Sequence, residues 1–562
     1  VPDKTAGLLG QTDLMARPIL AALLLCVVPA GASDSDAASV QAAITELQGM
    51  IKSQRNRIEA LKAAKRPRAR SSRRLAGHGD HEPDIYGPEA EMRAYTTIEN
   101  FQGAMDHMWL IICGSLVMFM QAGFAMVEAG TCRFKNVQNI MLKNLTDVCV
   151  GTLGWYSLGW AFAYGGPTKE DSVYKVNGFA SSQQFFGHGF VTGRDDGQMT
   201  PTNSPVNWFF QWAFCSAAAT IVSGGVAERV KFGGYLIFSF LMTSIIYPMV
   251  VAWTWGYGFL AEMNDVGAFD FAGSGIVHMT GGVGALVGAI IAGPRLGRWT
   301  SDNNEEMSLK ARVFEMPEAF NPHSVVLIVF GTFALWWGWY GFNCGSTLQL
   351  HDYETGAKAA WVAMNTTLAA ATGGLMVFFL RFAMTRKLDV CGFCNGILAG
   401  LVSITAGCSN LESGSAVLAA FIGALVYQLT SSLLRMCKID DPIDAFAVHG
   451  ACGMWGVTAA AYFDMGAQFY HVHAWSGFQC MKDDDGNCIT GLWGQMYAAA
   501  WAELGMIIVW VGILCALIFG ILKALKLLEA DEDTQKEGFD LLKHSPRKAY
   551  DWGETDIPRT SI

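Results

Sequence analysis

The chain has 562 residues, of which 52% are hydrophobic and only 16% are charged. Soluble domains usually carry about 25% charged residues, so this composition excludes an ordinary soluble protein and predicts an integral membrane protein. The formal net charge of −10 gives no support for a nucleic-acid partner, and none is expected.

The N-terminal part of the chain has the pattern of a signal peptide followed by a polar region. A charged start at Met15–Arg17 precedes an apolar run that ends in Ala30–Ala32. Residues 1–32 are therefore interpreted as upstream residues and a cleavable signal peptide, with an uncleaved anchor as the alternative. Residues 33–104 are expected to be extracellular. Apolar residues recur there at heptad spacing, which fits a short coiled coil or a single amphipathic helix, and a basic linker follows at 65–74.

From residue 105 onward, hydrophobic segments long enough to cross a bilayer follow one another. They predict an all-α integral membrane protein whose transmembrane domain covers 105–527, followed by a cytoplasmic regulatory tail at 528–562. Eleven spans are predicted, near 106–128, 140–164, 207–228, 234–259, 271–293, 323–342, 359–381, 391–410, 414–434, 443–463 and 497–523.

Lysine and arginine residues are distributed unevenly between the two sets of loops that these spans define. One set holds Arg133, Lys135, Arg229, Lys231, Arg295, Arg298, Lys310, Arg312, Arg381, Arg386, Lys387, Arg435 and Lys438, and the other only Lys169, Lys175, Arg194, Lys358 and Lys482. Cytoplasmic loops carry the excess of positive charge. The N-terminus is therefore expected outside and the C-terminus in the cytoplasm of a multi-pass plasma-membrane protein.

The spans also suggest an internal repeat. Spans one to five and six to ten have matching layouts if the second set is inverted, which predicts two inverted five-helix repeats and a peripheral eleventh helix. Span five carries Asp270 and then His278, and span ten carries Asp444 and then His449. Inverted repeats place their functional site at the repeat interface, near the middle of the bilayer.

Of the eleven histidines, only His278 and His449 fall well inside a predicted span. An ionisable group inside a bilayer is costly, so a functional role is the default interpretation. Two imidazoles that share one proton resist taking a second, because like charges at contact distance repel. The pair can accept a proton from a cation or line a file of small polar molecules. Asp270 lies about two helical turns before His278, so no metal site and no cofactor are expected.

Six stretches of the sequence resemble one family. They are MDHMWLIICGSLVMFMQAGFAMVEAGTCRFKN (105–136), GGVAERV (224–230), DFAGSGIVH (270–278), GWYGFNCGS (338–346), DDPIDAFAVHGACG (440–453) and EGFD (537–540). In this combination and order the chain resembles the ammonium transporter family, the Amt/Mep/Rh group, and within it the Amt type.

The resemblance implies a set of substrate-binding residues. Trp255 matches the family's outer-vestibule tryptophan, Phe214 and Phe342 match two stacked phenylalanines that cap the pore, and Ser346 matches a serine that hydrogen-bonds the incoming cation. Aromatic faces attract an ammonium ion. Without the resemblance, Trp255 would be interpreted as a residue of the aromatic belt at the membrane interface, and Phe214 and Phe342 as ordinary core residues. The resemblance also assigns pore-wall positions to Leu335 and Thr405.

The implied activity is ammonium transport, not enzyme catalysis. Ammonium, or methylammonium, is recruited at the vestibule and gives up its proton, and neutral ammonia then passes the two histidines, with electrogenic proton transfer. Asp270 and Asp444 are assigned structural and electrostatic roles. The resemblance implies a homotrimer in the lipid bilayer, and the tail suggests a cytoplasmic regulator.

Three other functions remain open from the sequence: a channel of the Rh type for neutral gas, a transporter-like sensor that signals through its tail, and a membrane metalloenzyme. Fourteen cysteines are scattered along the chain, and Cys480 and Cys488 lie together in one polar loop. Because that loop is expected on the oxidising side, a disulfide between them is predicted. The Cys391–Cys394 pair of a lone CxxC is interpreted as packing cysteine.

Overall fold

The computed structural model describes residues 88–166, 178–193, 199–263, 267–301, 303, 305–463, 492–547 and 549–550. All of these residues belong to one compact unit, residues 86–562. The predicted signal peptide, the heptad-spaced residues and the predicted Cys480–Cys488 disulfide all lie outside the described residues. These features stay predictions.

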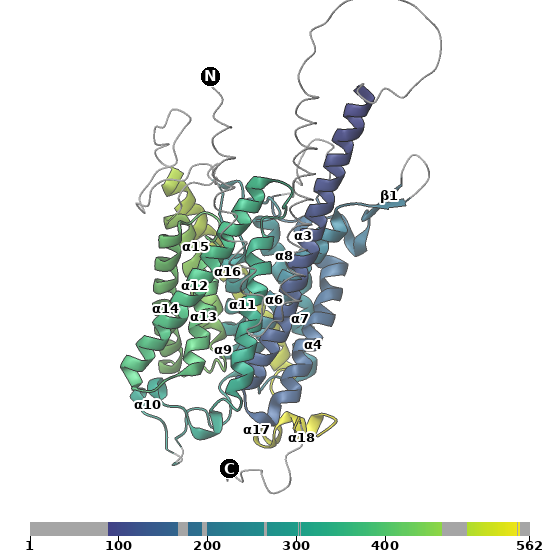
Figure 1. The fold of residues 1–562 in the computed structure, drawn as a ribbon. Helices are drawn as coiled ribbons and strands as arrows, with labels where there is room; N and C mark the ends of the chain where they lie inside the picture. The colour runs from purple at the N-terminus through teal and green to yellow at the C-terminus, as the bar shows by residue number, and fades with distance from the viewer. Residues whose placement is uncertain are drawn as a thin grey trace, which may run out of the picture. The chain divides into compact units, whose positions relative to one another are not determined.

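The described part of the chain is a bundle of long helices (Figure 1). Seven helical ranges are long and apolar enough to cross a membrane by length and composition: Ile98–Thr131, Phe232–Trp253, Ser274–Ala292, Val325–Gly345, Tyr353–Thr385, Ser413–Met436 and Tyr497–Ala524. The remaining predicted spans also coincide with helices, which are shorter or more polar. An all-α multi-pass membrane protein is therefore confirmed, while the count of eleven spans stays a prediction.

Each predicted span corresponds to one helix or to a short series of helical segments. The elements are α3 (Pro88–Thr131), η1 (Phe134–Asn136), α4 (Val137–Gly154), η2 (Trp155–Gly159), α5 (Trp160–Tyr164), η3 (Phe185–Gly187), α6 (Ser204–Gly225), α7 (Phe232–Leu241), η4 (Met242–Ile246), α8 (Tyr247–Trp253), η6 (Ser274–Met279), α9 (Thr280–Ala292), α10 (Leu309–Phe314), η7 (Glu318–Phe320), α11 (Val325–Gly345), α12 (Tyr353–Thr385), α13 (Val390–Thr405), α14 (Ser413–Met436), η8 (Phe446–Ala451), α15 (Cys452–Tyr462), α16 (Leu492–Ala524), α17 (Glu532–Glu537) and α18 (Phe539–Lys543). Strands β1 (Val191–Gly193) and β2 (Met199–Pro201) pair antiparallel, with Thr192 opposite Thr200.

The first long helix begins earlier than the predicted span. α3 runs from Pro88 to Thr131 without a break, so the expected boundary at residues 104 and 105 falls inside a helix. Proline is tolerated in the first turn of a helix, where its missing N–H costs nothing, and no other proline follows within the segment. The polar residues before 104 therefore extend the same helix that becomes apolar after it.

The helices differ in how much of their apolar surface is covered. In the most apolar stretch of η6 and α9, 78% of the residues are buried, compared with 28% in α12 and in α16. Because lipid is as apolar as the side chains themselves, outward-facing apolar residues are expected on the periphery of a membrane bundle. The segment that carries His278 is therefore central.

The C-terminal segment folds back against the start of α4, at what we call the tail end of the bundle (Figure 1). The carboxylate of Asp540 accepts hydrogen bonds from the backbone N–H groups of Gln138, at 2.9 Å, and Asn139, at 3.1 Å. The backbone N–H of Phe539 donates to the Asn136 side chain at 3.0 Å. Asp540 thereby satisfies backbone donors that a helix leaves open in its first turn.

Candidate functional site

The two histidines singled out in the sequence meet in the centre of the bundle. His278 lies in η6 and His449 in η8, and each segment is a π-helical turn at the start of a longer helix. Their Nδ1 atoms are 3.2 Å apart, and the ring centroids are 5.2 Å apart at an interplanar angle of 21°. π-helical turns are rare and occur frequently at functional sites. The chain places one at each histidine.

Both imidazoles are shielded from solvent, with 0% and 4% of their surfaces exposed. A contact between two Nδ1 atoms needs one donor and one acceptor, so the pair holds one proton between them. The buried Nε2 of His278 makes no hydrogen bond with any part of the chain that the structure describes. That nitrogen is available to a small polar molecule.

An aromatic stack lies beside the histidine pair. The rings of Phe214 and Phe342 are 4.0 Å apart and nearly parallel, at 27°. Trp255 meets Phe214 edge to face, with centroids 5.8 Å apart. The Phe342 ring also lies 5.3 Å from the ring of His278. The three aromatic residues predicted from the sequence are therefore brought together, and Phe342 connects them to the histidines.

Ser346 directly follows α11, one helical turn after Phe342. Its hydroxyl donates a hydrogen bond to the Phe342 carbonyl at 2.9 Å. Because the hydroxyl proton is used there, the serine oxygen keeps its lone pairs to accept a hydrogen bond.

The two predicted pore-wall residues are both fully buried. Leu335 lies on α11, two turns before Phe342. The hydroxyl of Thr405 donates to the Leu401 carbonyl at 2.7 Å and accepts the indole N–H of Trp339 at 2.9 Å. Thr405 thus orients a neighbouring tryptophan.

Asp270 holds the start of η6. Its two carboxylate oxygens accept four backbone N–H groups, those of Gly273, Ser274, Gly275 and Ile276, at 2.8 to 3.0 Å. Its own carbonyl accepts the indole N–H of Trp255 at 2.8 Å. Four backbone donors stabilise a carboxylate in its charged form. Asp270 therefore fixes both the π-helical turn of His278 and the orientation of the tryptophan.

The matching acid for His449 is Asp441, whereas the sequence interpretation paired it with Asp444. Asp441 precedes its histidine by eight residues, the same spacing as Asp270 and His278, and it accepts the backbone N–H of Phe446 at 2.7 Å. Asp444 instead accepts hydroxyl groups of two α14 residues, at 2.9 and 3.0 Å. The equal spacing of the two Asp–His pairs could have identified Asp441 from the sequence.

Two glycines let the two histidine segments approach each other. A Cβ on Gly282 would lie 2.2 Å from the backbone nitrogen of Gly450, and one on Gly453 would lie 2.4 Å from the carbonyl of Ser274. Real Cβ atoms do not make such contacts, so any larger residue would force the helices apart. The short distance between the imidazoles depends on this close backbone packing.

Comparison with known proteins identifies the family. The model of the Ammonium Transporter Family matches residues 108–550. The chain belongs to the Ammonium Transporter Family. It is 35% identical to ammonium transporter 1 member 3 of Solanum lycopersicum over 466 residues, covering 80% of this chain and 93% of the relative. It is 36% identical to ammonium transporter Amt2 of Archaeoglobus fulgidus over 472 residues, covering 80% and 90%.

Solved structures of ammonium transporters have the same fold. A sensor Amt protein superimposes with a TM-score of 0.66 at 29% identity, covering 80% of this chain and all of that protein. Mep2 of Candida albicans superimposes with a TM-score of 0.62 at 25% identity, covering 76% and 87%. Members of the Ammonium Transporter Family are membrane transporters, not enzymes. In the described residues no group of three or more His, Cys, Asp or Glu side chains could hold a metal ion.

The sequence interpretation missed two aromatic residues of this family member's site. Trp339 lies flat against His278, with ring centroids 4.9 Å apart and an angle of 15°. Phe124, on α3, lies 5.9 Å from the ring of His449. Trp339 precedes Phe342 by three residues, so both share one face of α11, and this spacing could have revealed it. Nothing local marks Phe124.

Proposed function

We propose that this protein moves ammonium across the plasma membrane by binding NH4+ at an aromatic vestibule and passing NH3 between the two histidines. Trp255, Phe214, Phe342 and Ser346 form the binding end, and His278 and His449 the waterless passage. The observation that carries this proposal is the pair of buried imidazoles, 3.2 Å apart, directly beside the stacked phenylalanines.

Selectivity follows from the cost of dehydrating an ion. A bare cation loses its hydration in an apolar passage and finds no countercharge there, so potassium and sodium are rejected. Ammonium escapes this penalty because it can release a proton and continue as neutral ammonia. The complete burial of Phe214, Phe342 and His278 supports a passage from which bulk water is excluded.

The vestibule residues provide two kinds of attraction for the cation. The aromatic faces attract a positive charge, and the anionic Asp270 behind Trp255 adds a favourable potential. The Ser346 oxygen has lone pairs available for one N–H of ammonium, because its own proton is bonded to the Phe342 carbonyl. These contacts favour ammonium over water in the vestibule.

The histidine pair then replaces the hydrogen bonds that ammonia leaves behind in water. With one proton held between the two Nδ1 atoms, the Nε2 atoms point to the passage, one imidazole as donor and the other as acceptor. The unpartnered Nε2 of His278 supports this role. We infer that the pair also relays the released proton, which makes transport electrogenic.

The same proposal includes the wider architecture. Eleven spans, arranged as two inverted five-helix repeats and an outer eleventh helix, would place the histidines at the repeat interface. The matching pairs Asp270–His278 and Asp441–His449, each capping a π-helical turn, support such a repeat. We further propose a homotrimer with the N-terminus outside, the tail in the cytoplasm, and a cytoplasmic regulator acting at the tail.

The test is methylammonium uptake with simultaneous current recording in a cell that lacks its own ammonium transporters. His278→Ala and His449→Ala should each lower the flux of methylammonium at least about tenfold or abolish the preference for ammonium over potassium, because hydrogen bonds to the guest are lost. His107→Ala, a change at an exposed histidine, is the matched control and should retain both. Unaltered selectivity in both histidine variants would contradict the proposal. Uptake without current would instead indicate a channel for neutral ammonia.

A further inference from the structure

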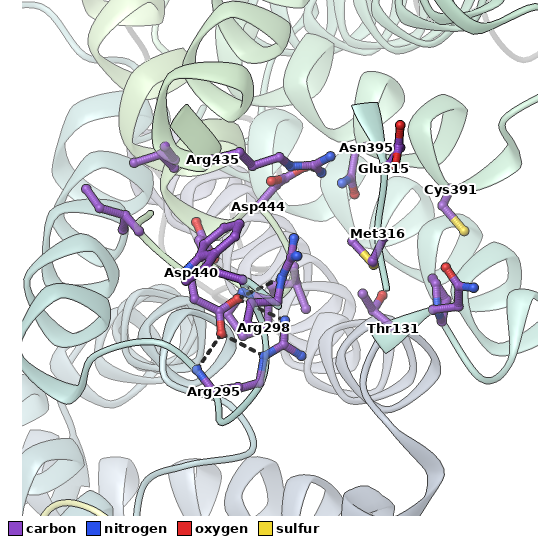
Figure 2. Close-up of a pocket in the computed structure, with 18 of the residues that line it drawn as sticks. Thr131, Arg295, Arg298, Glu315, Met316, Cys391, Asn395, Arg435, Asp440 and Asp444 are labelled. Atoms are coloured by element: carbon purple, nitrogen blue, oxygen red, sulfur yellow. Dashed lines mark hydrogen bonds and ion pairs between the residues drawn. The ribbon is translucent and has the colours of Figure 1, made fainter. Parts of the chain in front are cut away.

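A cavity of about 240 Å³ lies at the tail end of the bundle, and Figure 2 shows the side chains that line it. Its lining comes mainly from the loop after α9, the start of α13, the end of α14 and the loop before η8, and includes neither His278 nor His449. Four arginines line it: Arg295, Arg298, Arg381 and Arg435. Pockets for drug-sized ligands start at about 300 Å³, so this volume suits a smaller guest.

Most of the acids in the wall already have partners. The Asp440 carboxylate accepts two guanidinium N–H groups of Arg295, at 2.8 and 2.9 Å, and the backbone N–H of the same arginine at 2.8 Å. Figure 2 shows these bonds as dashed lines. Asp389 accepts an N–H of Arg381 at 2.7 Å. These two arginines are therefore neutralised within the wall.

The other acids of the wall are either balanced by arginines or only partly charged. Asp444 accepts hydrogen bonds from the hydroxyl groups of Tyr427 and Ser431, and its charge is balanced by Arg435 at 3.6 Å and Arg381 at 3.9 Å. Burial, and then the nearby Asp444 carboxylate, raise the pKa of Asp441 to about 7, so it is partly protonated at neutral pH. Glu315 is exposed to solvent, which screens its charge.

Arg298 differs from Arg295 because its ion pair with Asp440 is long and two of its guanidinium nitrogens make no hydrogen bond within the described residues. Its side chain is 3% exposed and stacks on Trp299, with 4.3 Å between the guanidinium carbon and the ring centroid. Its Nε lies 3.5 Å from Asp440, and neither Nε nor Nη1 makes a hydrogen bond within the described parts of the chain. Burial lowers the pKa of Arg298 to about 10, so the group is charged at neutral pH.

Arg435 is a second cation with unused donors. Among the described residues its one ion pair is with Asp444, at 3.6 Å, a distance too long for a good hydrogen bond, and 22% of its side chain is exposed. Figure 2 shows Arg298 and Arg435 among the side chains that surround the same cavity. A buried charge without a hydrogen-bonded partner is costly, and an anion placed between the two guanidinium groups would remove that cost.

We propose that this cavity binds a small oxyanion of the phosphate type, held by Arg298 and Arg435. Guanidinium groups match the oxygens of phosphate because their N–H groups form planar, paired donors. The site is separate from the ammonium passage, and the inference does not depend on the transport mechanism. The anion is either free phosphate or the phosphate of a lipid headgroup.

The experiment measures binding of inorganic phosphate to the full chain in nanodiscs of phosphatidylcholine by calorimetry, with chloride at equal ionic strength as the reference. Wild-type protein should bind phosphate. Arg298→Gln and Arg435→Gln should each weaken binding at least about tenfold, because charged hydrogen bonds are lost. Arg312→Gln removes an arginine at the same end that does not line the cavity, and should bind like the wild type. Methylammonium uptake by each variant shows whether that variant is folded. If Arg298→Gln does not fold, the binding measured with Arg435→Gln decides the test.

A second arm replaces phosphate with nanodiscs that contain phosphatidylglycerol and measures the thermal unfolding temperature. An increase that Arg298→Gln abolishes and Arg312→Gln retains would assign the site to a lipid headgroup and support the proposal. The proposal is overturned if neither phosphate nor the anionic lipid has an effect, or if the effects persist in both Arg298→Gln and Arg435→Gln.

Discussion

The buried ion-pair network at the tail end gives the sharpest stability prediction. Glu228 lies beyond the end of α6 and is fully buried. It pairs with Arg295 at 2.9 Å and with Arg133, whose backbone N–H also donates to it at 2.9 Å. Arg295 in turn pairs with Asp440 at 2.8 Å. Glu228→Gln keeps the shape of the side chain but leaves two guanidinium groups with one anion fewer.

The expected loss can be worked from the proton affinity of this carboxyl. Burial by itself would raise the pKa of Glu228, but Arg295 and Arg133 outweigh burial and lower it from 4.5 to about 2. Each pKa unit corresponds to about 1.4 kcal/mol, so the charged form of Glu228 contributes about 3 kcal/mol to the free energy of unfolding at neutral pH. Removing one partner of a buried pair costs about 3–5 kcal/mol in other proteins, which agrees.

The assay is thermal unfolding of purified protein in detergent, at several pH values. At pH 7, Glu228→Gln should lower the unfolding temperature by about 3 °C, because the unfolding entropy of a chain this large is about 1 kcal/mol per degree. Because the pKa of Glu228 is lowered in the folded state, its contribution is complete above pH 4.5 and declines as pH falls toward 2. The difference between wild type and variant should therefore be constant from pH 7 to 5 and shrink below about pH 4.5.

The matched control is Glu306→Gln, which breaks the exposed pair with Lys438 at the same end of the bundle. Exposed pairs contribute little, so no measurable change is expected. An equal effect of both variants, or a difference between Glu228→Gln and wild type that grows as pH falls, would refute the reasoning.

Three further predictions concern the passage and the tail. Trp339→Phe should lower methylammonium uptake several-fold, because it removes the indole N–H that fixes the ring against His278. The control is Trp337→Phe, at a side chain that is 54% exposed, and it should leave uptake unchanged. Gly282→Ala should destabilise the fold by about 1–3 kcal/mol and so lower the unfolding temperature, because the added methyl group meets the facing backbone. Gly505 has open space around it, and Gly505→Ala should not lower the unfolding temperature. Asp540→Ala should remove the cap that the tail provides to α4, at a cost of about 1 kcal/mol, and should increase protease cleavage of the tail; unchanged cleavage would show that other contacts hold it.

The candidate site could be predicted from the sequence where a local pattern carried the information. His278 and His449 stand out because each is an ionisable residue within an apolar run, and the physical cost of such a group is the same in any fold. The motifs around Phe342 and Trp255 were informative through the family resemblance. Asp441 could also have been predicted, since it precedes His449 by the same number of residues as Asp270 precedes His278.

Other features depend on residues that are far apart in the chain. The rings of Phe124 and His449 lie 5.9 Å apart although more than 300 residues separate them in the chain, and no spacing in the sequence relates these positions. Glu228, Arg295 and Asp440 come from three separate loops, so the balance of charge in their network exists only after folding. The same holds for Arg298. In the sequence it is one of many loop arginines, and only the structure shows that it is buried with two guanidinium nitrogens that make no hydrogen bond within the described residues.

By itself, the sequence determined the class of the molecule, because hydrophobic length and the cost of charge in lipid act on each segment separately. It also singled out the two histidines that fall well inside predicted spans. Only the tertiary structure decided that their Nδ1 atoms lie 3.2 Å apart, since that distance requires glycine backbones on two helices to touch. It likewise decided which arginines are neutralised and which are left with unused donors, because electrostatic pairing depends on distances between loops that the order of residues does not specify.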